Sequence, residues 1–175
     1  MEAGFLIASP QMRDPTFQRT VVLLVQHNRE GALGLVVNRE SPVRLGNVVD
    51  RVMSISPARA NRPVLWGGPL ERGAGFVLFK GKAPEGWQIR GDLSVSASKE
   101  RLSALVASSA DFHLALGYAS WSAGQLEREF AEGSWLHVDA SADLIFDCPS
   151  SDRYDRALAR LGVSADSLWM IPINE

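Results

Sequence analysis

Two short apolar runs joined by a tight turn constrain the fold of this chain most. Residues 20–26 (TVVLLVQ) and 32–38 (ALGLVVN) are too short for typical helices and are rich in β-branched and large apolar side chains. The HNREG segment between them supplies the Asn and Gly that a tight reversal needs. The pattern predicts an antiparallel hairpin whose two strands are buried on both faces.

Similar runs predict further strands, and helical spacing predicts several short helices. Strands are expected at residues 4–8, 63–66 before a Gly-Gly-Pro turn, 75–79, 88–96, 111–120 and 134–140, and residues 143–149 fit either a strand or a helix. Helices are expected at residues 45–53, 98–109 and 154–161, and the apolar tail 168–175 is expected to dock. Because hairpin-like links dominate the first half, the sequence predicts an α+β fold with a mostly antiparallel, partly barrel-like sheet in one domain of residues 1–175.

The charge and cysteine content exclude several classes of protein. Eighteen basic and twenty acidic residues are spread along the chain, whereas direct nucleic-acid binding needs a clustered basic surface. The single cysteine, Cys148, is typical of a reducing compartment, and no apolar run approaches the roughly 20 residues of a membrane helix. We therefore expect a cytoplasmic protein that contacts neither nucleic acid nor membrane.

The segment GYASWSAGQLEREFAEGSWL, residues 117–136, carries more glycine and tryptophan than a short helix needs. Ser122 and Gln125 match a capping box, so a helix is predicted to begin with the Ser122 hydroxyl accepting a backbone N–H. Leu126 and Phe130 are expected on its buried face, and its three glutamates are expected to face solvent. Gly133 fits the position that ends the helix.

The approach to this helix resembles a binding site. Tyr118 and Trp121 place amphipathic aromatic side chains beside the helix N-terminus, and Gly124 lets a ligand approach the backbone. The alternative is structural: Trp121 and Trp135 are core aromatics and the glycines serve only turn geometry.

Three separated segments carry a resemblance to a known family. Residues 5–39 (FLIASPQMRDPTFQRTVVLLVQHNREGALGLVVNR), VLWGGP at 64–69 and the 117–136 segment together resemble the AlgH/YqgE family of bacterial proteins. The resemblance implies an α+β fold with a barrel-like sheet, a bacterial cytosolic location, no established biochemical activity and an indirect regulatory role. Phe79 and Tyr154 depart from the family pattern, in which His and Trp are common at these positions.

The residues favour a ligand- or protein-binding module over an enzyme. The predicted binding set is His27, Asn38, Gly67, Gly68, Tyr118, Trp121, Ser122, Gly124, Gln125 and Glu127.

A small hydrolase stays the alternative. It would combine His27 with Ser9 or Ser120, Asp14 and the Gly67–Gly68 backbone, although no Gly-x-Ser-x-Gly motif occurs. No metal or other cofactor is expected, because the three histidines lie far apart in sequence, Cys148 has no CxxC partner, and WGGP is not followed by the Lys of a P-loop.

Overall fold

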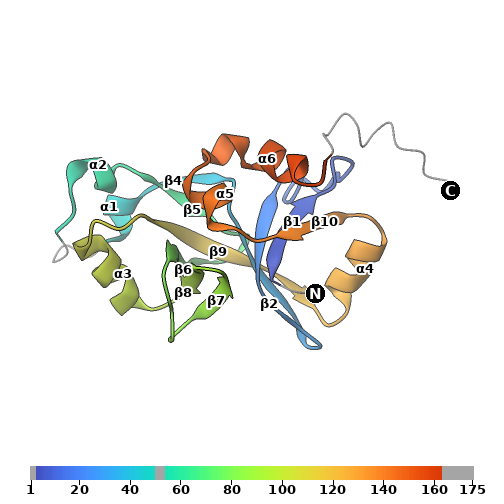
Figure 1. Ribbon diagram of the computed structural model, residues 1–175, viewed down its shortest axis with the longest axis horizontal. Coiled ribbons are helices and arrows are strands. Elements are labelled where there is room, and N and C mark those ends of the chain that lie inside the picture. Colours follow the sequence, from blue (N-terminus) through green and yellow to red (C-terminus); the bar gives the residue numbers. More distant parts are fainter. Residues whose placement is uncertain (1–2, 50–53, 163–175) are drawn as a thin grey trace.

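The long strand β9 (Phe112–Ser122) organises the fold of the computed structural model, which describes residues 3–49 and 54–162. It pairs antiparallel with β3 (Gly31–Val36) and β6 (Leu70–Lys80), and parallel with β5 (Pro63–Trp66), as it crosses the middle of the molecule (Figure 1). The other strands are β1 (Gly4–Ala8), β2 (Val21–Asn28), β4 (Glu40–Arg44), β7 (Trp87–Arg90), β8 (Leu93–Ser96) and β10 (Trp135–Asp139).

The strands form one ten-stranded sheet that does not close on itself. Its main path is β10-β1-β2-β3-β9-β6-β8-β7, and β4 joins through β5, which pairs with β9. Every pairing except that of β5 with β9 is antiparallel. The α+β class and the mostly antiparallel sheet are confirmed, and the sheet is open.

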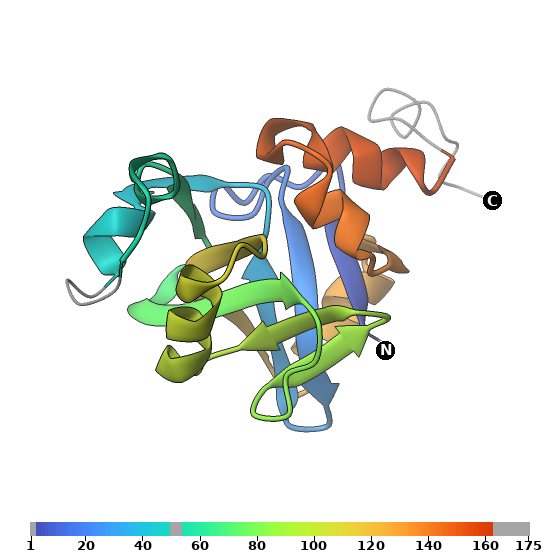
Figure 2. The same ribbon diagram turned by 60° about the vertical axis from the view of Figure 1, so that its left-hand side comes forward.

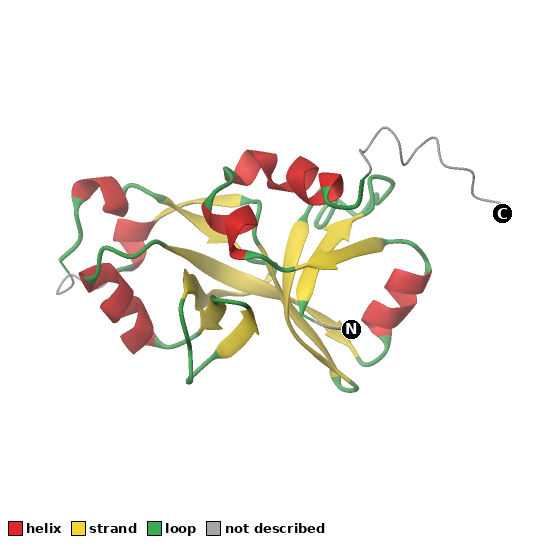
Figure 3. Cartoon of the chain, in the orientation of Figure 1, coloured by secondary structure: helices red, strands yellow, loops and turns green. Residues whose placement is uncertain are grey.

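Short helices lie around the sheet (Figure 3). Within the described residues they are α1 (Leu45–Val48), α2 (Pro57–Ala60), α3 (Lys99–Ala107), α4 (Gln125–Ala131), α5 (Ala142–Phe146) and α6 (Arg153–Ala159), with a 3-10 turn η1 (Ser150–Asp152). The segment 143–149 is therefore mainly helical. The helix predicted over 45–53 is present as α1 alone, and residues 50–53 and the tail 168–175 lie outside the described residues. None of these helices is long and apolar enough to cross a membrane.

Buried residues of β1, β2, α5 and α6 belong to the main hydrophobic core, and α6 lies across β1 and β2 (Figures 1 and 2). All five residues of β1 are buried, which confirms a strand covered on both faces. Tyr154, Ala157 and Leu158 of α6 pack into this core, and the Tyr154 hydroxyl donates to the Ala8 carbonyl at 2.6 Å. Leu161, expected on the same face, is 37% exposed, because the helix ends before it.

The predicted hairpin is present. β2 and β3 pair antiparallel through to Asn28 and Gly31, and the Asn28 side chain accepts the Glu30 backbone N–H at 2.8 Å inside the turn. Gly31 has φ +140°, a conformation that side chains with a Cβ rarely adopt.

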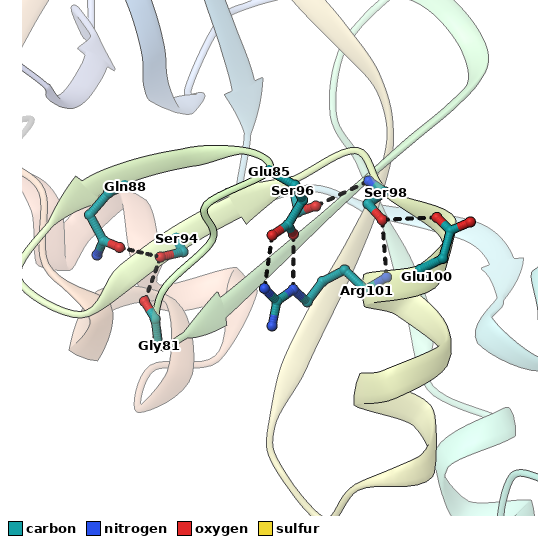
Figure 4. Close-up of polar contacts among 8 residues, drawn as sticks. All are labelled: Gly81, Glu85, Gln88, Ser94, Ser96, Ser98, Glu100 and Arg101. Carbon is teal, nitrogen blue, oxygen red and sulfur yellow. Dashed lines mark hydrogen bonds and ion pairs between the residues drawn. The ribbon is translucent and has the colours of Figure 1, made fainter.

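A polar network fixes the start of α3 against the loop before β7 (Figure 4). The Ser98 hydroxyl accepts the Arg101 backbone N–H at 3.2 Å, which confirms Ser98 as the N-cap. The Arg101 guanidinium donates two bonds to the Glu85 carboxylate, 2.9 Å from Nε and 2.8 Å from Nη2. This two-bond pair ties a helix to a loop sixteen residues earlier in the chain.

The Glu85–Arg101 pair predicts a pH-dependent contribution to stability. The Arg101 guanidinium, and after it the Ser96 hydroxyl, lower the pKa of the Glu85 carboxyl from 4.5 to about 2. A carboxyl with a depressed pKa in the folded state stabilises the fold above its unfolded pKa, and that contribution disappears as the pH falls through the folded pKa. We expect Glu85→Gln to lower the melting temperature at neutral pH and to match the wild type near pH 2.

Thermal unfolding across this pH range measures the difference, with Asp155→Asn as a control. The Asp155 side chain is 73% exposed and lies 3.7 Å from Arg19, so its loss should change little. A Glu85→Gln deficit that persists undiminished at pH 2 would contradict the electrostatic origin.

Candidate binding site

The start of α4 differs from the predicted capping box. β9 continues to Ser122, and the N-cap is Gly124, with φ +78°. The Gln125 side chain does accept the Ser122 backbone N–H at 2.9 Å, as predicted. The Ser122 hydroxyl, however, donates to the same Gln125 oxygen at 3.2 Å and caps no backbone N–H. This half of the prediction is wrong, because Ser122 ends a strand and lies two residues before the cap.

The inward face of α4 also differs from the prediction. Leu126 is fully buried, but Phe130 is 38% exposed and the Glu129 side chain turns toward two tryptophans instead. Leu126 and Glu129 are three residues apart and therefore share one face of the helix. The expectation that all three glutamates face solvent is wrong for Glu129.

The Glu129 carboxylate is held by three neutral donors. Its Oε1 accepts the indole N–H groups of Trp121 at 3.1 Å and of Trp135 at 2.9 Å, and its Oε2 accepts the Gln125 amide at 2.8 Å. Hydrogen bonds to an ionised acceptor are stronger than those between neutral groups. The carboxylate is therefore oriented without any ion pair to a basic side chain among the described residues.

Three aromatic rings pack together beside this carboxylate and line one cavity with it. The Phe17 ring centroid lies 6.5 Å from that of Trp121 and 6.0 Å from that of Trp135, and the two indoles meet edge to face at 5.8 Å. Trp121 is 5% exposed and Trp135 is 2% exposed, so both are core residues whose polar edges meet Glu129.

A cavity of about 330 Å³ opens beside the three rings. Asp14 and Glu132 line it together with Glu129, and no basic residue is among the described residues that line it. Its volume lies at the lower end of the range of small-molecule sites, about 300–1,000 Å³. The pocket combines aromatic rings with an excess of negative charge.

His27 and Glu127 lie together, outside this cavity. The His27 Nε2 is 3.3 Å from the Glu127 Oε2, and the His27 side chain is only 8% exposed. The contact lacks hydrogen-bond geometry, so both ring nitrogens are buried without a hydrogen-bond partner among the described residues. The Glu127 backbone N–H, and then His27, lower the pKa of the Glu127 carboxyl. The acid beside His27 is thus Glu127, whereas Asp14 lines the aromatic cavity.

Gly67 and Gly68 pack closely against β9 at Gly117 and Tyr118. A Cβ on Gly67 would lie 2.3 Å from the Gly117 carbonyl oxygen, and the Gly67 N–H donates to the Leu116 carbonyl at 2.8 Å. The Tyr118 hydroxyl donates to the Glu71 carboxylate. These residues do not line the aromatic cavity, and the bonded Gly67 N–H is not free to stabilise an oxyanion.

Asn38 bridges two backbone segments. Its Oδ1 accepts the Val21 N–H at 2.9 Å and its Nδ2 donates to the Arg19 carbonyl at 2.8 Å. Of the predicted set, the structure places Trp121 and Gln125 at the aromatic cavity, while Asn38 joins the start of β2 to the end of β3.

Sequence reasoning missed a second and larger cavity, of about 630 Å³, that includes Arg153, His113 and Cys148. One signal was present: Arg153 precedes Tyr154 and lies four residues before Ala157, which places a basic residue on the buried face of α6. Within residues 3–49 and 54–162, no group of three His, Cys, Asp or Glu side chains is arranged to hold a metal ion.

Comparison with known proteins identifies close relatives over nearly the whole chain. A family model described as AlgH-like matches residues 5–166. A UPF0301 protein from Photobacterium profundum is 44% identical over 174 residues, covering 94% of this chain and 93% of the relative. Another from Ralstonia nicotianae is 42% identical over 167 residues, covering 91% of this chain and 87% of the relative.

Two solved structures share the fold. The solution structure of the AlgH protein from Pseudomonas aeruginosa matches with a TM-score of 0.77 and 37% identity, covering 99% of this chain and 95% of that chain. A crystal structure of a Corynebacterium diphtheriae protein matches with a TM-score of 0.73 over 91% of this chain and 86% of that one, and its 23% identity supports likeness of fold alone.

Proposed function

This chain belongs to the AlgH-like family, and we propose that it is a binding module that recognises an organic cation in the cavity beside Trp121, Trp135 and Glu129. The observation that carries the proposal is the Glu129 carboxylate. Two indole N–H groups and one amide orient it, and no basic side chain lines the cavity in the part of the chain that the structure describes.

The chemistry of the pocket favours an amine or guanidinium group. A cation gains from a carboxylate that is already oriented, because little reorganisation is needed on binding. Aromatic faces add attraction of about 0.5–2 kcal/mol when the cation loses water. Asp14 and Glu132 add negative potential at the same cavity.

The cation comes either from a small molecule or from a Lys or Arg side chain of a protein partner. We propose that the chain acts in the cytoplasm as an indirect regulator, through the ligand or protein that it binds. The net charge of −2 and the dispersed basic residues support this indirect role over contact with nucleic acid.

Substitution of Glu129 tests the proposal. Glu129→Gln keeps an oxygen that can accept the indole N–H groups but removes the charge, so affinity for a cation should fall about tenfold or more, equivalent to about 1.4 kcal/mol. The readout is the pair of Trp121 and Trp135 indole N–H resonances, which should shift when arginine, lysine, choline or a Lys/Arg-rich peptide is added. The free amino acids and the peptide distinguish the two sources.

Glu100→Gln provides the matched control. It removes the same charge from α3, where Glu100 accepts a hydrogen bond from the Ser98 hydroxyl and does not line the cavity. Cation binding should survive this change. Indole resonances that none of the probes shift, or that shift equally in Glu129→Gln, would exclude the proposed site.

The hydrolase alternative has one observation in its favour, the buried His27 ring beside Glu127. No hydroxyl or thiol hydrogen-bonds to His27 in the described part of the chain, so the pair lacks the nucleophile that a hydrolase needs. The binding proposal predicts that His27→Gln leaves the cation affinity unchanged.

A further inference from the structure

The larger cavity lies between the β4–β5 edge, the start of β9 and the segment from α5 through η1 to α6. These elements meet in the upper middle of Figure 1. Three acidic residues of the lining are exposed: Glu40, Asp111 and Asp147. The buried lining residues are Arg153, Cys148, Leu65 and Ile145. The cavity therefore has an acidic, exposed rim and an interior that holds a basic side chain among apolar ones.

Arg153 carries a buried positive charge, and the Glu40 carboxylate stabilises it only from beyond ion-pair distance. It is 3% exposed, and its guanidinium donates from Nε to the Cys148 carbonyl at 2.9 Å, and from Nη1 and Nη2 to the Val37 and Ile145 carbonyls at 2.5 Å each. A guanidinium has five N–H groups, so these three bonds leave two donors without an acceptor among the described residues. Within residues 3–49 and 54–162, no Asp or Glu lies at ion-pair distance from it. A buried charge in this state requires a counter-charge or further hydrogen bonds.

The His113 imidazole reports the same positive potential. Burial, and after it the charges of Arg153 and Arg62, lower the pKa of His113 to about 4, and the nearby Asp111 opposes this only as the weakest contribution. At neutral pH the ring is uncharged. The exposed acids therefore do not cancel the positive potential at this ring.

We propose that this cavity binds the carboxylate or phosphate group of a small organic anion, with Arg153 as the buried anchor and Arg62 as a second cation. Guanidinium groups match both oxyanions through paired N–H donors. Ser150 and Ser151 add hydroxyl groups, and Leu65 and Phe146 add apolar surface for the rest of the molecule. The acidic rim selects against polyanions such as nucleic acids, and favours a ligand with one anionic end and a neutral or cationic outer end.

The test measures whether an anion changes the titration of His113. Inorganic phosphate, acetate and an amino acid with an uncharged side chain are each added at millimolar concentration. Chloride at equal ionic strength serves as the reference. A bound oxyanion should raise the pKa of His113 above about 4, because it offsets the neighbouring arginine charges. The imidazole resonances of His113 give this pKa, and the phosphate and carboxylate arms identify which group binds.

Two variants that each remove one positive charge distinguish binding in the cavity from general electrostatic attraction of anions to the protein. Arg62→Gln removes a cation that lines the cavity but leaves the Arg153 bonds to the backbone intact, and anion affinity should fall about tenfold. Arg156→Gln removes the same charge from an exposed position of α6 outside the cavity, and affinity should be unchanged. An unmoved His113 pKa with every anion, or equal weakening in both variants, would overturn the proposal. Amine probes that bind at the aromatic cavity should leave the pKa of His113 unchanged, so the two proposed sites can be confirmed or excluded independently.

Discussion

Gly68→Ala should lower the free energy of unfolding by about 3 kcal/mol or more, and the variant is expected to fold poorly. A Cβ at this position would lie 2.1 Å from the Tyr118 carbonyl carbon, 2.2 Å from its oxygen and 2.6 Å from the Ala119 nitrogen. All three atoms belong to the backbone of β9, which cannot move aside because it is hydrogen-bonded to β3 and β6. The φ of +155° adds strain for any residue that carries a Cβ.

Gly73→Ala supplies the matched control for this experiment. Gly73 lies in β6, is exposed, and no heavy atom lies within 4 Å of the position that its Cβ would occupy. The same chemical change should therefore alter stability by no more than about 0.5 kcal/mol. Urea unfolding of both variants gives the comparison. Equal stability of the two would show that the turn after β5 does not approach β9 as closely as the structure places it.

The strands and the central hairpin were predictable because their signals are local. Residues 4–8, 20–26 and 32–38 are apolar runs bounded by turn formers, and burial on both faces follows from the absence of alternation. Helices with mixed faces were less predictable. Which side of α4 faces inward depends on Trp121 and Trp135. Their rings meet at 5.8 Å although β1, β2 and β3 lie between β10 and β9 in the sheet order, and the sequence gives no sign of this contact.

The pairing of strands also explains how far the candidate site could be predicted. Trp121 and Gln125 were identified from a single segment, because both lie near one strand-to-helix junction. Glu129 could not be distinguished from two other glutamates on the same helix without the positions of the indole N–H groups. The Arg153 cavity was harder still to predict from the sequence, because its lining residues come from β5, β9 and α6, which lie far apart in sequence.

Arg153→Met should destabilise the fold by about 3 kcal/mol, even though it removes a buried charge. Replacing a buried ion pair by apolar side chains of similar volume is often neutral or stabilising by about 1–4 kcal/mol, because the desolvation of the charges is relieved. Here the substitution also leaves three carbonyls, those of Val37, Ile145 and Cys148, without their donor. Each buried acceptor without a partner costs about 1–3 kcal/mol, so the loss outweighs the relief.

The positions of these carbonyls should make the loss of stability in Arg153→Met larger than the number of lost hydrogen bonds alone suggests. Val37 follows β3, while Ile145 and Cys148 belong to α5 and the turn after it, so Arg153 joins α5 and α6 to the sheet. Arg156→Met, at an exposed position of α6, should stay within about 0.5 kcal/mol of the wild type in urea unfolding. If Arg153→Met proves as stable as the wild type, the bonds from Arg153 to these three carbonyls do not stabilise the fold, and the prediction is wrong.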